Sequence, residues 1–476
     1  MADTCDFPSF LQVQIQTEVI HEVIEVSPLK FQLGEWLTKY VVCSVYACLI
    51  LIVICLWLFG LPEKAPQHAT VQKSYPYGCV VFLGVVYTLS FFTIDQYVPS
   101  FPQMEKDLSG SQTLMSLTVQ MNFIVKAVFG LLTAGLSDRI GRRPILIMSM
   151  IVLCFGSLGC ACSQRIEWFV ASRILQGIGE SVEPVLFAVV RDHIADPDDR
   201  YSVISVMHTM SILGMLVAPT FGAWLAGLFN WRISFVGLAV TWAFMAVYAW
   251  AAIVESCPDI PDEAVDERDY FQDLSRILNF RALSLLLTLS CLTGAILTFE
   301  SNTSYIAQGT FDISMMATAL VMFAYGGFLV LGLLVKRFCF SSTSVLLTCK
   351  TSLTLLACAG IASVLLGCFY SQFLWAYLAG SFLQSSVVNI AIIALNVLFL
   401  EPLGDCAGVA ASFQTFSMGV LPSLYSMVST QLLINGGLKV FIAFQASICI
   451  AAGLFFWLGH LMESTESTWK SCEPSD

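Results

Sequence analysis

The stretch AGLSDRIGRRP, residues 134–144, is a short polar connection between two long apolar runs. Its charged residues and its turn glycine are Asp138, Arg139, Gly141, Arg142 and Arg143. Apolar runs next to a basic connection indicate membrane-spanning helices, and an excess of Lys and Arg marks the cytoplasmic side of short loops. The stretch therefore predicts a membrane protein in which this connection lies on the cytoplasmic side.

The composition of the whole chain excludes a soluble globular protein. Of 476 residues, 57% are hydrophobic and 12% are charged, and the mean hydropathy is +0.78. The net charge of −12 comes mainly from acidic tails and from the segment after residue 254, and no basic tract indicates a nucleic-acid partner. Most of the 17 cysteines lie in apolar runs without a neighbouring histidine, so we expect no metal site.

Apolar runs of about 20 residues, the length needed to cross a bilayer as a helix, recur along the chain. The predicted spans are 40–61, 77–98, 113–136, 144–163, 167–190, 201–227, 232–254, 282–304, 313–335, 344–368, 372–398, 406–434 and 438–460. An acidic segment, 255–281, divides the last twelve into two sets of six. This arrangement is typical of a transporter built from two repeated halves.

These spans give a prediction of the domain organisation. The predicted segments are a polar leader 1–39, an extra transmembrane helix 40–61, a six-helix bundle 77–254, an acidic cytoplasmic loop 255–281, a second six-helix bundle 282–460 and a polar tail 461–476. The extra helix follows a long polar leader and lacks a small-residue cleavage site, which favours a retained helix over a removed signal peptide.

Several motifs resemble those of one transporter family. These are the opening stretch, TIDQYVPSFPQMEKDL (93–108), RILQGIG (173–179), VVRDHI (189–194) and GMLVAPTFGA (214–223). Together they resemble the bicyclomycin- and chloramphenicol-resistance type of drug:proton antiporters in the major facilitator superfamily. The second half resembles that family more loosely, and residues 1–76 have no counterpart in it.

The resemblance implies a fold and an activity. The fold would be all-helical, with two six-helix bundles and inverted repeats, and the apolar run 40–61 would add one extra helix. The activity would be export of drugs in exchange for protons, by a monomer in the cytoplasmic membrane that uses the proton gradient and no cofactor. The antiporter-signature helix would contain Gly214, Pro219 and Gly222. Alanine replaces the glycine that the family has at positions 134, 218 and 223.

The charges of the opening stretch allow a conformational role. A carboxylate is stabilised near the N-terminus of a helix, so Asp138 and its neighbours would dock on helix ends of the other half and hold a state closed to the cytoplasm. The alternative is that these charges only orient the chain in the membrane.

Charges inside the spans are costly and commonly functional. The resemblance implies that Asp95 binds the coupling proton and that Arg173 changes its proton affinity; a structural ion pair is the alternative. Glu180 and Glu183 are spaced i, i+3, and Lys126 on another span would neutralise one of them. The other would bind a proton or a cationic group of the substrate, unless the charges only orient helices.

Further polar residues are candidates for the substrate cavity. Together with Lys126 they are Glu300, Gln384, Asn389 and Asn396. Glu300 is interpreted as either a gate or an interfacial residue, and the three amides as either cavity groups or hydrogen-bonding links between helices. His208 is expected to be a hydrogen-bonded core histidine rather than a titrating group.

Two other functions remain open from the sequence. Lys126 with the two glutamates would also suit uptake of a zwitterion such as an amino acid. A receptor or membrane enzyme on the same scaffold is a more remote alternative, because the sequence has no nucleotide-binding glycine loop, zinc motif or Ser-His-Asp order.

Overall fold

The computed structural model describes residues 77–194, 196–256, 279–339, 343–400 and 407–470. The predicted helix 40–61, the leader before it and most of the loop 255–281 lie outside the described residues.

The described residues form two sets of helices. The first half contains α2 (Tyr77–Asp95), η1 (Val98–Ser100), α3 (Phe101–Asp107), α4 (Gln112–Ile140), α5 (Arg142–Cys162), α6 (Ile166–Glu180), α7 (Glu183–His193), α8 (Pro197–Leu228) and α9 (Trp231–Ala252). The second half contains α11 (Phe280–Ser304), the π-helix η3 (Tyr305–Thr310), α12 (Met315–Cys339), α13 (Val345–Tyr370), α14 (Leu374–Leu400) and α15 (Ala407–Lys470).

Ten of the described helical segments are long and apolar enough to cross a membrane. The last of them contains two helices, because α15 is interrupted at Gly437, where φ is 71°. One further crossing is divided between α6 and α7, each too short to span alone. The twelve crossings match the predicted spans from residue 77 onward, and the all-helical fold is confirmed. The helix α15 continues to Lys470, into the segment predicted as a polar tail.

Local sequence explains where these helices begin and break. Side chains of Ser111, Asn230, Asn279 and Ser344 cap the N-termini of α4, α9, α11 and α13 by accepting a backbone N–H. Pro184 follows the break between α6 and α7. Its ring would clash with the carbonyl of residue 180 and it has no N–H to donate, which favours a break in the helix at this point.

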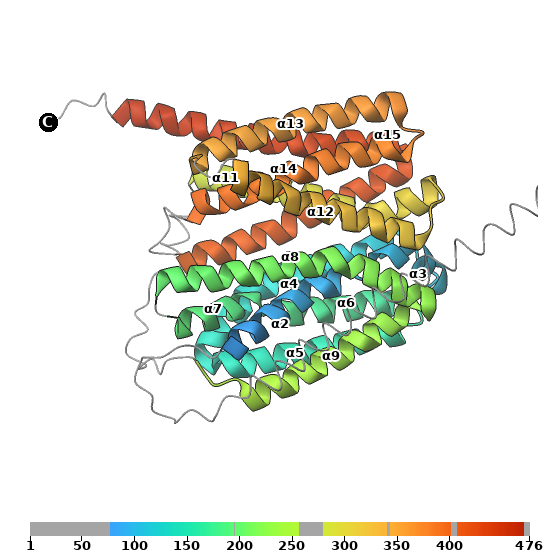
Figure 1. The fold of residues 1–476 in the computed structure, drawn as a ribbon, viewed down its shortest axis with the longest axis vertical. Helices are drawn as coiled ribbons and strands as arrows, with labels where there is room; N and C mark the ends of the chain where they lie inside the picture. The colour runs from blue at the N-terminus through green and yellow to red at the C-terminus, as the bar shows by residue number, and fades with distance from the viewer. Residues whose placement is uncertain (1–76, 195, 257–278, 340–342, 401–406, 471–476) are drawn as a thin grey trace, which may run out of the picture. The chain divides into compact units, whose positions relative to one another are not determined.

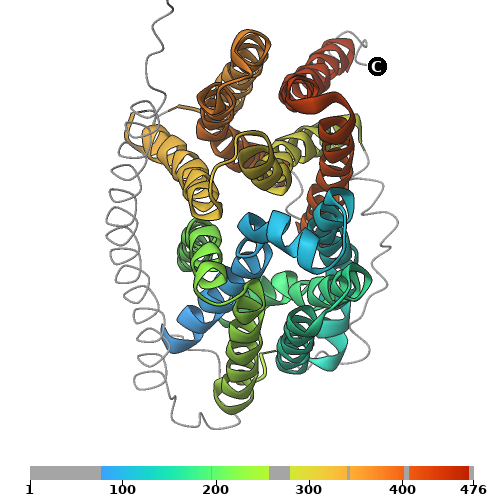
Figure 2. The same cartoon turned by 90° about the vertical axis from the view of Figure 1, so that its right-hand side faces the viewer.

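The two halves repeat the same packing (Figures 1 and 2). In the first half α2 packs on α8, α5 on α6 and α9, and α4 on α6. In the second half the equivalent pairs are α11 on α15, α13 on α14 and α15, and α12 on α14. The halves meet through α4 on α15 and α8 on α12, again an equivalent pair of contacts. The helices α2 and α11 therefore hold corresponding positions.

A polar pair inside each half follows the same repeat. Gln176 on α6 donates its amide to Ser157 on α5 at 2.8 Å. Gln384 on α14 donates its amide to Ser363 on α13, also at 2.8 Å. The same bond between corresponding helices is direct evidence that the halves are repeats.

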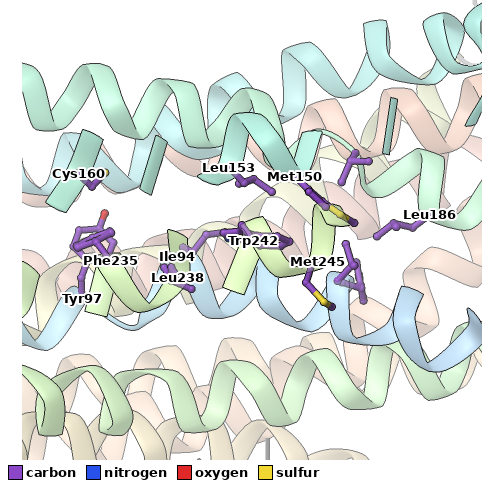
Figure 3. Packing of buried hydrophobic residues seen from close by; sticks show 14 of the residues in the cluster. Ile94, Tyr97, Met150, Leu153, Cys160, Leu186, Phe235, Leu238, Trp242 and Met245 are labelled. Carbon is purple, nitrogen blue, oxygen red and sulfur yellow. The ribbon is translucent and has the colours of Figure 1, made fainter. Parts of the chain in front are cut away.

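A buried apolar cluster holds the first half together. Figure 3 shows side chains of this cluster between the helices, including Ile94, Tyr97, Leu153, Phe235 and Trp242. Aromatic side chains bury large areas, so they dominate such cores. Because Ile94 and Tyr97 flank Asp95, the cluster fixes the end of α2 from which that carboxylate projects.

Candidate functional site

Two carboxylates from the two halves line one small cavity. Asp95, the last residue of α2, is 4% exposed, and Glu300 lies near the end of α11. The cavity has about 20 Å³ of space for the centre of a water molecule, room for about one water. Its other lining residues are Met215, Pro219, Phe299, Met322, Tyr325, Gly326 and Leu329. Repeat-equivalent helices thus each contribute one carboxylate to an otherwise mostly apolar space.

Arg173 is fully buried beside Asp95 without forming a direct ion pair with it. Its Nη1 donates to Gln176 Oε1 at 2.6 Å and to the main-chain oxygen of Thr93 at 3.4 Å. Its guanidinium lies 4.7 Å from the ring centre of Tyr97. Within the described structure its Nε and Nη2 have no hydrogen-bond partner. Arg173 therefore acts on Asp95 through its charge. Its bond to Thr93 also holds the end of α2, where Asp95 lies.

A second polar group lies around Lys126 on α4. Its Nζ is 2.8 Å from Glu183 Oε2 and 4.7 Å from the ring centre of Phe91. The hydroxyl of Tyr87 donates to Glu183 Oε1 at 3.2 Å and lies 3.1 Å from Nδ1 of His208. The four polar side chains form a continuous chain of contacts from α4 through α7 and α2 to α8.

The two glutamates of the broken helix differ in their surroundings. Glu183 is the partner of Lys126, whereas Glu180 is fully buried at the end of α6. In the amide orientation that satisfies both of its polar atoms, Asn122 donates to Glu180 Oε2 at 2.9 Å and accepts from the backbone N–H of Gly177. The break between α6 and α7 lies between the two glutamates, and both of them act on the charge of Lys126.

The helix α8 approaches α2 unusually closely next to Asp95. A Cβ added to Gly222 would lie 1.6 Å from the main-chain oxygen of Gln96, and one added to Gly214 would lie 2.3 Å from Thr88 Cγ2. Pro219, between these glycines, lines the cavity of Asp95. Small residues permit such contact between membrane helices. The buried Ala218 and Ala223 keep this helix face small as well.

The two halves contact each other at the end of the bundles where η1 lies, here called the η1 side. Ser304 Oγ donates to the main-chain oxygen of Val98 and Gln308 Nε2 to that of Pro99, both at 2.7 Å. Nearby, Gln431 Nε2 donates to Thr113 Oγ1 at 2.9 Å. These bonds hold η1 against the end of α11 and against η3, and α4 against α15, so the structure is closed on the η1 side.

The comparison with protein families agrees with this architecture. A model of the Major Facilitator Superfamily matches residues 80–424, which include most of both halves and the whole polar site. The chain belongs to the Major Facilitator Superfamily. It is therefore a multi-pass integral membrane protein and a transporter rather than an enzyme.

Relatives within the superfamily include resistance proteins. A chloramphenicol resistance protein of Pseudomonas aeruginosa is 30% identical over 38% of this chain and 42% of its own length. The multidrug resistance protein MdtL of Klebsiella pneumoniae is 25% identical over 70% of this chain and 90% of its own. The chain spans about half the length of two of the curated relatives that it matches, 58% of one and 42% of the other.

The fold also matches solved superfamily structures. A bacterial homologue of the human lysosomal transporter Spinster, in an inward-facing and occupied conformation, superimposes with a TM-score of 0.64. The alignment covers 82% of this chain and 98% of that one at 16% identity, so it shows the shared fold.

In this superfamily member the opening stretch forms contacts with the first half. Arg142 pairs with Asp138 at 2.5 Å and with Asp192 on α7 at 3.1 Å. The carboxylate at a helix N-terminus is that of Glu255, which accepts the backbone N–H groups of Arg142 at 2.8 Å and Arg143 at 3.2 Å. The docking of Asp138 on a helix of the second half stays a prediction, and Glu255, just after α9, is a carboxylate at the N-terminus of α5.

The turn at Gly141 and the two other arginines complete this region. Gly141 has φ of 112°, and a Cβ there would lie 2.5 Å from Glu255 Oε2, so glycine is required. Arg143 Nη2 donates to the main-chain oxygen of Trp250 at 2.6 Å. Arg139 is exposed.

The polar residues of α14 lie apart from the carboxylate cavity. Gln384 is buried between Ser363 and Cys449, which donates its Sγ to Gln384 Oε1 at 3.6 Å. Asn396 accepts a hydrogen bond from Gln414, and Asn389 is partly buried. Gln384 and Asn396 thus link helices within the second half, the alternative that the sequence left open.

The aromatic part of the site was not predicted from the sequence. Tyr87, Phe91 and Asp95 are spaced by four along α2, which places them on one face, and this spacing was available as a signal. Tyr325, which stacks on Phe299 with ring centres 3.8 Å apart, had no such signal. His208 is hydrogen-bonded as expected, but it is exposed rather than in the core.

Proposed function

We propose that this transporter exports small amphipathic organic compounds in exchange for protons, by alternating access of its two halves. The observation that carries the proposal is the buried Asp95 carboxylate, which faces a cavity between the halves and forms no direct ion pair with another described residue. A buried carboxylate without a partner is costly when ionised, so uptake of a proton is favoured there. The names of the resistance relatives support drugs as the substrate class.

The proposed conformational cycle uses the contacts between the halves. Closure on the η1 side, as in this structure, is one end of the cycle, and the cytoplasmic membrane is the proposed location. Opening that side requires breaking the bonds that η1 accepts from Ser304 and Gln308, and the bond between Thr113 and Gln431. Few polar bonds have to be exchanged, which suits a rocking movement of two bundles.

A second candidate is proton-coupled uptake of a zwitterionic metabolite such as an amino acid. The pair of Lys126 with Glu183 favours it, because these groups offer one cation and one anion within 2.8 Å of each other. The aromatic rings of Tyr87 and Phe91 beside this pair would contact an apolar part of the substrate.

The sign of substrate-driven proton movement separates the two candidates. Purified protein in liposomes with a lumenal pH dye would receive chloramphenicol, ethidium or single amino acids from outside. Proton exit from the lumen on substrate entry indicates exchange, and proton entry together with substrate indicates uptake by co-transport. Proton entry with an amino acid and no response to either drug would reject drug export in favour of the second candidate.

A further inference from the structure

Four carboxylates and two cations gather between the helices at the level of the cavity, and two of the carboxylates, Glu183 and Glu300, are only partly buried. The carboxylates are Asp95, Glu180, Glu183 and Glu300, and the cations are Lys126 and Arg173. Glu183 takes Lys126 in a close ion pair, and Arg173 and Lys126 both act on Asp95 from α6 and α4. Among the described residues, the charged group that acts on Glu300 is Asp95 and not a cation.

The cavity of these two carboxylates offers little to a metal ion. Apart from Asp95 and Glu300, its side chains carry one oxygen, the hydroxyl of Tyr325. Hard cations bind to six or more oxygens in most protein sites. By contrast, two carboxylates that line one small and mostly apolar cavity favour the binding of a proton, because the proton removes the repulsion between like charges.

We propose that Asp95 and Glu300 form one proton-binding site shared by the two halves, and that this site must hold a proton for the η1 side to close. The proposal rests on the proposed proton coupling and adds its second residue and its structural consequence. Closure brings α2 and α11 together at the cavity. Loss of the proton leaves two like charges there, and their repulsion separates the halves on the η1 side.

The sign of the pH effect follows from linkage. The closed state brings the carboxylates together and so binds the proton more tightly than the open state. Acidic pH therefore favours closure, and rising pH favours opening of the η1 side. Arg173, Lys126 and Glu180 lie in the same half as Asp95 and accompany it in the closed and in the open state. They therefore change the midpoint of the pH effect and not its sign.

A cross-link across the halves measures closure without any substrate. Thr113 and Gln431 are exposed and hydrogen-bonded to each other on the η1 side. The double variant Thr113→Cys/Gln431→Cys would be treated with a short thiol-specific cross-linker from about pH 5 to about pH 9. The reactivity of each cysteine also changes with pH, so its rate of modification would be measured in each single-cysteine variant and used to correct the cross-linked fraction. Protein without the introduced pair reports cross-linking of the native cysteines.

The pair should respond to pH in a way that depends on both carboxylates. The cross-linked fraction should fall about twofold or more as pH rises, since repulsion then opens the η1 side. Adding Glu300→Gln or Asp95→Asn should keep the fraction high at every pH. Asp312→Asn, which removes an exposed carboxylate on the same side and suits the positive φ of that position, should leave the pH response unchanged.

Each outcome decides the proposal. A pH response that survives Glu300→Gln overturns it, even if Asp95 still couples transport to protons. A response to Na⁺ at constant pH, in place of a response to pH, would show a cation site and also overturn it. If Glu300→Gln fails to fold, Asp95→Asn gives the same comparison. Loss of substrate-driven proton movement with an intact cross-linking response would instead reject the proposed function alone.

Discussion

The main-chain oxygen of Gln96 lies where a side chain at Gly222 would begin, 1.6 Å from the position of a Cβ. The contact joins α8 to α2 at the residue that follows Asp95. A glycine of the antiporter-signature helix is thus needed for packing at the carboxylate cavity. It places Pro219 and Met215 of α8 against that cavity.

Gly222→Ala should destabilise the protein, because the added methyl group must push α8 away from α2. Overpacking of this kind costs about 1–3 kcal/mol. The thermal unfolding midpoint of the purified protein in detergent measures the effect. Gly227→Ala is the matched control on the same helix, since a Cβ there meets nothing within 4 Å. Equal midpoints for the two variants would contradict the close approach.

Lys126→Met should be more harmful than the double variant Lys126→Met/Glu183→Gln. The single change leaves the carboxylate of Glu183 buried without its cation, which costs about 3–5 kcal/mol, whereas the double change removes both charges. Thermal unfolding of wild type, both single variants and the double variant forms a complete cycle. Additive losses would show that the 2.8 Å pair is not an energetic unit.

Glu255→Ala should loosen the start of α5. The carboxylate accepts two backbone N–H groups at that helix N-terminus, and loss of such a cap costs about 0.5–2 kcal/mol. Hydrogen exchange of the amides of Arg142 and Arg143 should increase. Glu167→Ala removes a carboxylate from an exposed pair with Arg165 and serves as the control. Unchanged exchange in Glu255→Ala would reject the cap.

Gln384→Leu should lower stability and leave substrate selectivity unchanged. The substitution leaves the hydroxyl of Ser363 without its donor, a loss of about 1–3 kcal/mol. Gln176→Leu, at the corresponding bond of the first half, should have a similar effect on stability. Competition among several transported drugs measures selectivity. A change of selectivity in Gln384→Leu would place this amide in the substrate cavity after all.

The sequence predicted the architecture well because the signals were local. Apolar runs and short polar connections fix the spans, and the acidic segment after residue 254 marks the division into halves. The break between α6 and α7 was missed, although Pro184 was a visible signal for it.

The partners of the charged residues were harder to predict, because they depend on contacts between distant segments. Lys126 was expected to neutralise one of two glutamates, and only the structure selects Glu183. The cavity shared by Asp95 and Glu300 joins residues from different halves. Glu255 follows α9 and reaches the start of α5, a contact for which the spacing along the chain gives no signal.

Proton-driven accumulation by Asp95→Asn tests the central claim most directly. Liposomes containing this variant should still exchange a labelled drug for the unlabelled drug, because exchange needs no net proton transfer. They should not accumulate the drug in response to an imposed pH gradient, whereas wild type and Asp312→Asn should. Accumulation by Asp95→Asn at the wild-type level would contradict proton coupling through Asp95.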